Sequence, residues 1–131
     1  MRRSTLLLIL FLTACSSIQQ PVMQPGVSDR LFCGLSIPGG GEVSEQEWRG
    51  FVREEVTPRL PEGFTMWRAE GYWRDRTGAP VTETVLVIEV VHRYDARVDD
   101  HLLQIAEAWK RRFRQDAVLR VVGPARMQFI N

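Results

Sequence analysis

The stretch Leu31–Trp48, LFCGLSIPGGGEVSEQEW, predicts a strand, a glycine-rich bend and the start of a helix. Its first seven residues place an apolar side chain at every second position, which is typical of a strand with one buried face. Pro38 ends this strand because proline has no N–H group to donate to a neighbouring strand. Ser44 and Glu47 form a capping box, so we expect a helix to begin near Glu45.

The loop between this strand and this helix allows two interpretations. Its glycines permit positive φ angles, and it leads into the positive end of a helix dipole, where backbone N–H groups can hold an anion. The alternative, which we favour, is that the glycines only turn the chain, because the run lacks the lysine of a P-loop and the spacing of a dinucleotide fingerprint. The candidate anion or ligand loop consists of Ser36, Gly39, Gly40, Gly41 and Glu42.

The rest of the chain continues this pattern of strands and helices. Apolar side chains recur at helical spacing over about 45–57 and 96–115, and strand-forming residues fill 64–74, 81–92 and 118–122, with 125–130 as an extension or edge. A short polar turn at 75–78 joins two of these strands into a hairpin. The order β-α-β-β-α-β predicts an α+β, ferredoxin-like sandwich: a four-stranded antiparallel sheet with two helices on one face.

The first fifteen residues resemble the leader of a bacterial lipoprotein. Arg2 and Arg3 precede the apolar run Leu6–Leu12, and Leu12-Thr13-Ala14-Cys15 resembles a lipobox. The resemblance implies cleavage between Ala14 and Cys15 and acylation of the Cys15 thiol, which would anchor the protein to membrane lipid. An ordinary secretory peptide cut nearby is the alternative, and a retained membrane helix is not favoured because the apolar run is far shorter than ~20 residues.

We therefore expect three segments: a signal peptide over 1–14, a lipidated cysteine with a flexible tether over 15–29, and one domain over 30–131. Residues Ser16–Asp29 are polar, contain two prolines and show no periodicity, which is typical of a linker. Ser16 after the cysteine resembles the sorting pattern of lipoproteins that face the periplasm from the outer membrane.

Charge and side-chain chemistry exclude several classes of function. Without Arg2 and Arg3 the chain has fifteen basic and sixteen acidic residues, so no basic field favours nucleic acid. Cys33 is alone once Cys15 carries lipid, and we expect it to be a buried apolar residue. His92 and His101 fall in no catalytic or metal motif, so the sequence predicts no catalytic residue, metal or cofactor.

The uncovered face of the predicted sheet is the candidate interaction surface. In the strand over 81–92 the even positions suffice for the core, while the odd positions, which include Glu83, are partly apolar and partly acidic. The predicted interaction face consists of Phe32, Tyr72, Val85, Val87 and Glu89, with Arg68 beside them. We expect it to contact a second copy of the chain or another envelope protein, and an idle amphipathic surface is the alternative.

Four motifs resemble a family of small bacterial lipoproteins that is classed as a domain of unknown function. They are Gly34-x-Ser36-Ile37-Pro38-x-Gly40-Gly41 with Trp48, Val56-Thr57-Pro58-Arg59, Gly71-x-Trp73-Arg74 and Lys110-x-Arg112-Phe113-x-Gln115, within a resemblance that covers about Asp29–Phe129. The resemblance adds no activity. We interpret the chain as a non-catalytic envelope binding module; the alternative is a small periplasmic hydrolase or ligand-binding enzyme centred on Ser36, with Glu42, Arg112 and Gln115 nearby.

Overall fold

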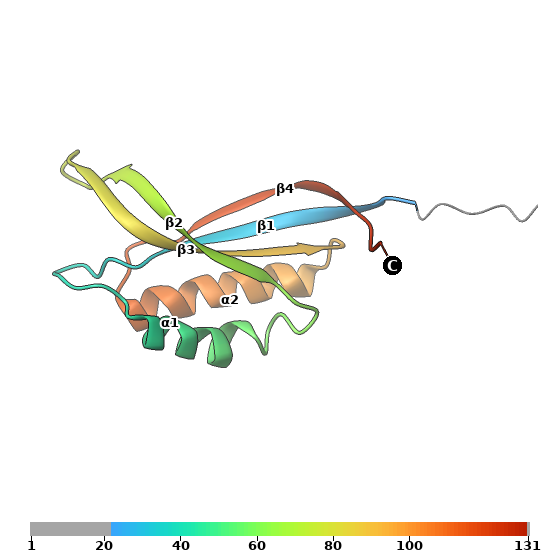
Figure 1. Cartoon of the computed structure of the whole chain (residues 1–131), viewed down its shortest axis with the longest axis horizontal. Helices are drawn as coiled ribbons and strands as arrows, with labels where there is room; N and C mark the ends of the chain where they lie inside the picture. Colours follow the sequence, from blue (N-terminus) through green and yellow to red (C-terminus); the bar gives the residue numbers. More distant parts are fainter. Residues whose placement is uncertain (1–21, 131) are drawn as a thin grey trace, which may run out of the picture.

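A computed structural model describes residues 22–130 of the chain as one antiparallel sheet with two helices packed on one face (Figure 1). The strands lie in the order β2-β3-β1-β4, which confirms the ferredoxin-like α+β fold. The predicted signal peptide and Cys15 lie outside the described residues. No helix within 22–130 has the length and apolar character needed to cross a membrane. The elements are β1 (Gln24–Gly34), α1 (Glu45–Phe51), η1 (Val52–Val56), β2 (Thr65–Arg74), β3 (Pro80–His92), α2 (Ala96–Phe113) and β4 (Leu119–Met127).

Strand β1 begins well before the predicted domain boundary at residue 30. Residues 24–29 pair with β4, and from Val27 onward they also pair with β3. The prediction of a flexible tether up to residue 29 is therefore wrong for residues 24–29. Pro25 is tolerated because it lies where β1 has a neighbour on one side only, so a missing N–H group is not needed on the other side.

The two ends of the predicted first strand also differ from expectation. The regular ladder ends at Gly34 rather than Ile37, and Ser36 forms only an isolated bridge to Glu42. On the other side of the sheet, β4 runs without a break through Gly123 and Pro124, where we expected the strand to stop. Pro124 is accommodated because β4 is an edge strand.

The predicted first helix is confirmed, with a wider last turn. The Ser44 side chain accepts a hydrogen bond from the Glu47 backbone N–H, and the Glu47 carboxylate accepts one from the Ser44 backbone, which completes the capping box. The final turn, η1, is π-helical: both the N–H and the hydroxyl of Thr57 donate to the Val52 carbonyl oxygen, at 2.9 and 3.0 Å. Pro58 follows directly, and a proline cannot donate the next helical hydrogen bond.

The core lies between the sheet and the helices. Trp109 of α2 packs edge-on against Phe51 of α1, with ring centroids 5.0 Å apart, and its indole N–H donates to the Gly34 carbonyl oxygen at 3.3 Å. This bond ties the end of β1 to the middle of the helical layer. The fully buried side chains around it include Leu31, Cys33, Leu35, Val56, Leu86, Ile88, Leu102 and Ile105.

Candidate functional site

The face of the sheet opposite the helices is covered by no element of the described chain (Figure 1). The strand registers decide which side chains lie on this open face, because directly paired residues share a face. Glu83 pairs with Gly71, Val85 with Gly34 and Ala69, and Val87 with Phe32 and Trp67. The open face includes Ser28, Arg30, Phe32, Gly34, Thr65, Trp67, Ala69, Gly71, Trp73, Val81, Glu83, Val85, Val87, Glu89, Val91, Leu119, Val121 and Gly123.

The structure corrects the predicted interaction face at three positions. Val87 is only 1% exposed because Phe32 and Trp67 flank it, and Val85 is also buried. Tyr72 pairs with Thr82, which places it on the helix side of the sheet, and Arg68 lies on that side as well. Phe32 and Glu89 do lie on the open face.

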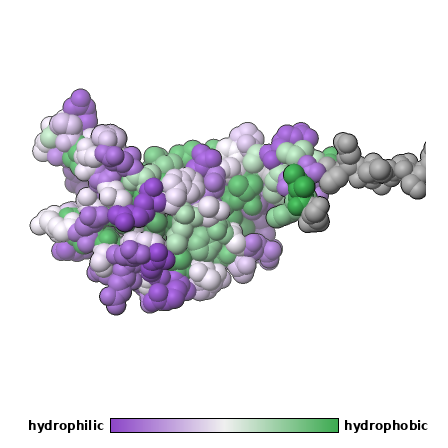
Figure 2. Space-filling model, in the orientation of Figure 1, coloured by the Kyte–Doolittle hydropathy of each residue, from purple (hydrophilic) through white to green (hydrophobic). Residues whose placement is uncertain are grey.

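The apolar residues that reach the surface of this face include three that were not part of the predicted interaction face, namely Trp67, Trp73 and Leu119. Trp67 and Trp73 alternate with Tyr72 along β2, and a period of two separates the faces without saying which one meets the helices. Trp73 is 48% exposed and Leu119 is 60% exposed. Figure 2 shows that hydrophilic residues gather at the end of the molecule with the hairpin tip and α1, while apolar residues reach the surface along its middle.

Two glycines open a cleft in the open face near the tip of the β2–β3 hairpin. A Cβ atom on Gly34 would lie 2.6 Å from the Glu83 carboxylate, and one on Gly71 would lie 2.7 Å from a methyl group of Val85. A larger residue at either position would collide with the Glu83 or the Val85 side chain, so both positions must stay small for the cleft to keep this shape. We call it the open-face cleft; it has a volume of about 650 Å³, and its lining includes Phe32, Gly34, Gly71, Trp73, Glu83 and Leu119, with residues 36–38 and 115–117 at one end.

Several polar groups of the cleft are already engaged. Gln115 donates its side-chain N–H to the Ser36 carbonyl oxygen at 2.7 Å, which joins the end of α2 to the loop after β1. Ser36 in turn donates its backbone N–H to the Glu83 carboxylate at 3.3 Å. Tyr72 borders the cleft at the hairpin end, although its register position belongs to the other face.

The glycine-rich loop beside the cleft forms a turn. Gly39, Gly40 and Gly41 all have positive φ angles, and a Cβ atom on any of them would meet nothing within 4 Å. Within the loop, the Ile37 N–H donates to the Gly41 carbonyl oxygen at 3.0 Å. At the start of α1 the Ser44 N–H already donates to the Glu47 carboxylate. The interpretation that the glycines only turn the chain accounts for this geometry, and anion binding by the loop stays a prediction.

A second carboxylate on the open face, that of Glu89, accepts hydrogen bonds from two side chains of β1. Arg30 donates to the Glu89 carboxylate at 2.7 Å, and the Ser28 hydroxyl donates to the same oxygen at 2.8 Å. These hydrogen bonds, with that from Arg30 the larger, lower the pKa of Glu89 below its usual range. Glu89 therefore stays ionised, with Arg30 as its counter-charge.

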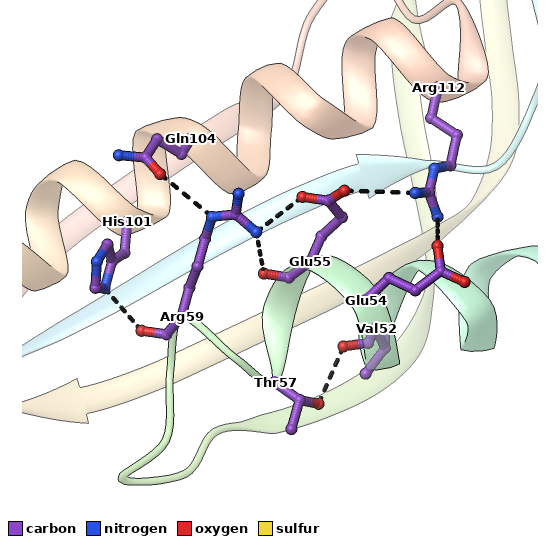
Figure 3. A network of polar contacts seen from close by, with 8 residues as sticks. All are labelled: Val52, Glu54, Glu55, Thr57, Arg59, His101, Gln104 and Arg112. Carbon is purple, nitrogen blue, oxygen red and sulfur yellow. Dashed lines mark hydrogen bonds and ion pairs between the residues drawn. The ribbon is translucent and has the colours of Figure 1, made fainter.

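The structure brings neither histidine to Ser36. His92 lies at the far end of β3, nine residues along the strand from Glu83, which corresponds to roughly 30 Å. His101 belongs to a network between the helices, where its ring Nδ1 lies 2.8 Å from the Arg59 carbonyl oxygen (Figure 3). Burial raises the pKa of the Cys33 thiol to about 12, which confirms it as an inert core residue.

Figure 3 also accounts for Arg112, the candidate cation of the hydrolase alternative. Its guanidinium pairs with Glu54 at 2.9 Å and with Glu55 at 3.4 Å, and so joins α2 to the first helix. Ser36 thus has neither a histidine base nor a free arginine beside it in the described chain. The hypothesis of a hydrolase centred on Ser36 is therefore not supported, because a serine nucleophile needs a base within hydrogen-bond distance.

Comparisons with known proteins give a family and a fold. The family model described as "Protein of unknown function (DUF3574)" matches residues 28–129. No curated protein sequence matches the chain. A phage SAM lyase in complex with S-methyl-5'-thioadenosine has a TM-score of 0.59 at 17% identity, covering 75% of this chain and 80% of the lyase. The apo state of a phage SAM lyase has a TM-score of 0.56 at 15% identity, covering 82% of this chain and 94% of the lyase.

Proposed function

We propose that this chain, which belongs to the DUF3574 family of proteins of unknown function, is a binding module that holds a small molecule in the open-face cleft. The observation that carries this proposal is the cleft itself, which Gly34 and Gly71 border without side chains of their own, beneath the Glu83 carboxylate and a Val85 methyl group. Glycine weakens a strand, so two glycines facing one cavity from either side of β3 favour a hollow that is used.

The size and lining of the cleft support this proposal. Its volume of about 650 Å³ lies within the range of roughly 300–1,000 Å³ for small-molecule sites, which are mostly apolar with a few polar groups. Here Phe32, Trp73 and Leu119 provide the apolar walls and Glu83 the charge. A phage SAM lyase of similar fold is in complex with S-methyl-5'-thioadenosine, so one protein of this architecture holds a small molecule.

The module would act at a membrane surface. The lipobox resemblance supports acylation of Cys15, and the domain begins at Gln24, so only eight residues separate the two. A chain of that length spans at most about 30 Å, which holds the Gln24 end of the domain near the lipid and leaves the cleft at Gly34 roughly 33 Å further along β1. Membrane fractionation of the full chain tests this: we expect Cys15→Ser to release the protein into the soluble fraction.

The binding proposal is tested by replacing one of two matched tryptophans. Trp67 and Trp73 lie on the same face of β2 at 40% and 48% exposure, and only Trp73 lines the cleft. The experiment titrates S-methyl-5'-thioadenosine and 2-phenylethanol into the chain from residue 15 onward, carrying Cys15→Ser, and follows the Gly34 and Gly71 amide signals by NMR. We expect both signals to shift, and Trp73→Ala to weaken binding about fivefold or more while Trp67→Ala leaves it within twofold. The proposal would be contradicted if neither glycine signal shifted, or if Trp73→Ala and Trp67→Ala weakened binding equally.

The part of the open face outside the cleft supports the predicted protein contact, and we propose a second copy of the chain as its partner. Trp67 and Val121 expose apolar surface there, at 40% and 41%. Light scattering on Val121→Glu tests this contact, with Val122→Glu as the control because Val122 lies on the same strand but on the opposite face. A dimer broken by the first substitution alone would support the contact; a monomeric parent chain would exclude it.

A further inference from the structure

We infer that the ligand of the open-face cleft carries a positive charge, as an organic ammonium or sulfonium group attached to an apolar or aromatic body. The inference rests on the proposed function and adds the chemical class of the ligand. It depends on one carboxylate, Glu83, and on the residues that the chain places around it.

Three acidic residues line the cleft, and two of them are already engaged. Asp75 accepts hydrogen bonds within its own turn, from the Thr77 N–H at 2.8 Å, the Thr77 hydroxyl at 2.6 Å and the Ala79 N–H at 3.0 Å. Asp116 lies 3.1 Å from the Arg76 guanidinium. Asp75 is thus held by three hydrogen bonds from its own turn, and Asp116 by an ion pair.

Glu83 has no such partner within the described chain. Its carboxylate accepts one backbone hydrogen bond, from Ser36 at 3.3 Å, and no arginine, lysine or histidine of residues 22–130 lies within ion-pair distance. The carboxylate group lies directly over Gly34, since a Cβ atom there would be 2.6–3.0 Å from it. The absence of a side chain at Gly34 therefore leaves room for the charge on the floor of the cleft.

Glu89 provides an internal comparison, because it lies six residues further along β3 on the same face. The chain neutralises Glu89 with Arg30 at 2.7 Å. Arg30 pairs directly with Glu89 in the ladder between β1 and β3, but this ladder ends where Gly34 pairs with Val85, so β1 places no cation opposite Glu83. Ser36 beyond the end of the ladder donates only its backbone N–H. Among the described residues, Glu89 thus has a cationic partner, Arg30, whereas Glu83 on the same face has none.

The remaining lining favours a cation over an anion or a neutral group. None of the described residues that line the cleft is basic, although the chain has seventeen basic residues. Aromatic faces such as those of Trp73 and Phe32 attract cations, most strongly where water is partly excluded. An anion would instead face the Glu83 carboxylate with nothing to compensate the repulsion, and like charges brought together are costly.

Three probes that share a phenyl group and differ in charge test this inference. They are 2-phenylethylammonium, 2-phenylethanol and 3-phenylpropanoate, titrated at pH 7 into the chain from residue 15 onward with Cys15→Ser. The readout is the shift of the Gly34 and Gly71 amide signals. We expect the ammonium to bind about tenfold more tightly than the alcohol, as for a hydrogen bond to a charged group, and the propanoate to bind most weakly.

Glu83→Gln identifies the group responsible. Glutamine keeps the shape of the side chain and an oxygen that can accept the Ser36 hydrogen bond, so the fold should be retained, and we expect the ammonium and the alcohol to bind within twofold of each other. Glu62→Gln, at an exposed loop position outside the cleft, should keep the tenfold preference.

The outcomes separate the two proposals. If the alcohol binds in the cleft as tightly as the ammonium, or if Glu83→Gln keeps the preference, the charge inference is overturned while the cleft remains a binding site. If none of the three probes shifts the two glycine signals, both proposals are overturned.

Discussion

Asp29 is the one charged side chain that is buried in the described part of the chain, at 1% exposure. Arg120 on the neighbouring strand β4 donates to its carboxylate at 3.0 Å and also reaches Asp99 near the start of α2. Hydrogen bonding to Asp29, more than that to Asp99, raises the pKa of Arg120 above its usual range. One guanidinium thus holds the edge strand, the central strand and a helix together.

We expect Arg120→Leu to lower the free energy of unfolding by about 3 kcal/mol, because it leaves the Asp29 charge buried without a partner. Urea denaturation followed by circular dichroism measures this. The control is Arg126→Leu, on the same strand, whose side chain makes one long hydrogen bond within residues 22–130, to the Met23 carbonyl oxygen at 3.5 Å. Equal losses in the two variants would show that the buried pair contributes nothing specific.

Glu89 makes stability depend on pH in the acid range. Its pKa is lowered in the folded protein, chiefly by the hydrogen bond from Arg30, so its contribution is present above the unfolded pKa of about 4.3 and is lost as the pH falls through the lower folded value. We expect Glu89→Gln to be less stable than the parent chain at pH 7 and this difference to shrink below about pH 4. Urea titrations at several pH values measure the difference; a gap that stays constant would contradict the assignment.

At the scale of elements, the short first helix depends on its ends. α1 has seven residues before it widens into η1, and Ser44 with Glu47 satisfies its free N–H groups. Its other end is held against α2 by Arg59 and Arg112, as Figure 3 shows. A helix this short is not stable by itself in water, so its cap and its packing decide whether it forms.

We expect Ser44→Ala to lower the free energy of unfolding by about 1 kcal/mol, since it removes the side-chain oxygen that caps the helix. Ser44→Thr keeps a hydroxyl at this position and should retain most of the stability. Thermal unfolding of the two variants beside the parent chain measures the difference. The prediction fails if alanine and threonine have the same effect.

At the scale of the whole molecule, β1 joins both halves of the sheet, since it pairs with β3 on one side and with β4 on the other. Its first residues, 24–29, belong to the segment that we expected to be a linker. Gln24–Gly26 pair with β4 alone, opposite Ala125–Met127. Removing this part of β1 would leave the C-terminal half of the edge strand without its neighbour.

We therefore expect a chain that starts at Val22 to unfold cooperatively, and one that starts at Arg30 to lose the cooperative transition or to unfold at a much lower temperature. The shorter chain also lacks Asp29, which leaves Arg120 without its buried partner. Thermal unfolding by circular dichroism compares the two. Equal midpoints would show that residues 24–29 do not belong to the folding unit.

The sequence by itself determined the order of the elements, the capping box and the ferredoxin-like fold. These features follow from local signals: the spacing of apolar residues, the residues at helix ends, and the glycines and prolines between them. The hairpin of β2 and β3 and the apolar character of Cys33 were predictable for the same reason. Each depends on neighbours a few residues away along the chain.

Only the tertiary structure decided where β1 begins, which face of β2 meets the helices, and that Val87 is buried on the open side. It also decided that Gly34 and Gly71 line one cavity and that, among residues 22–130, no cation lies beside Glu83 while Arg30 pairs with Glu89. These outcomes depend on strand register, which pairs residues tens of positions apart. A period of two reveals that a strand has two faces, and only the pairing across the sheet assigns each face its surroundings.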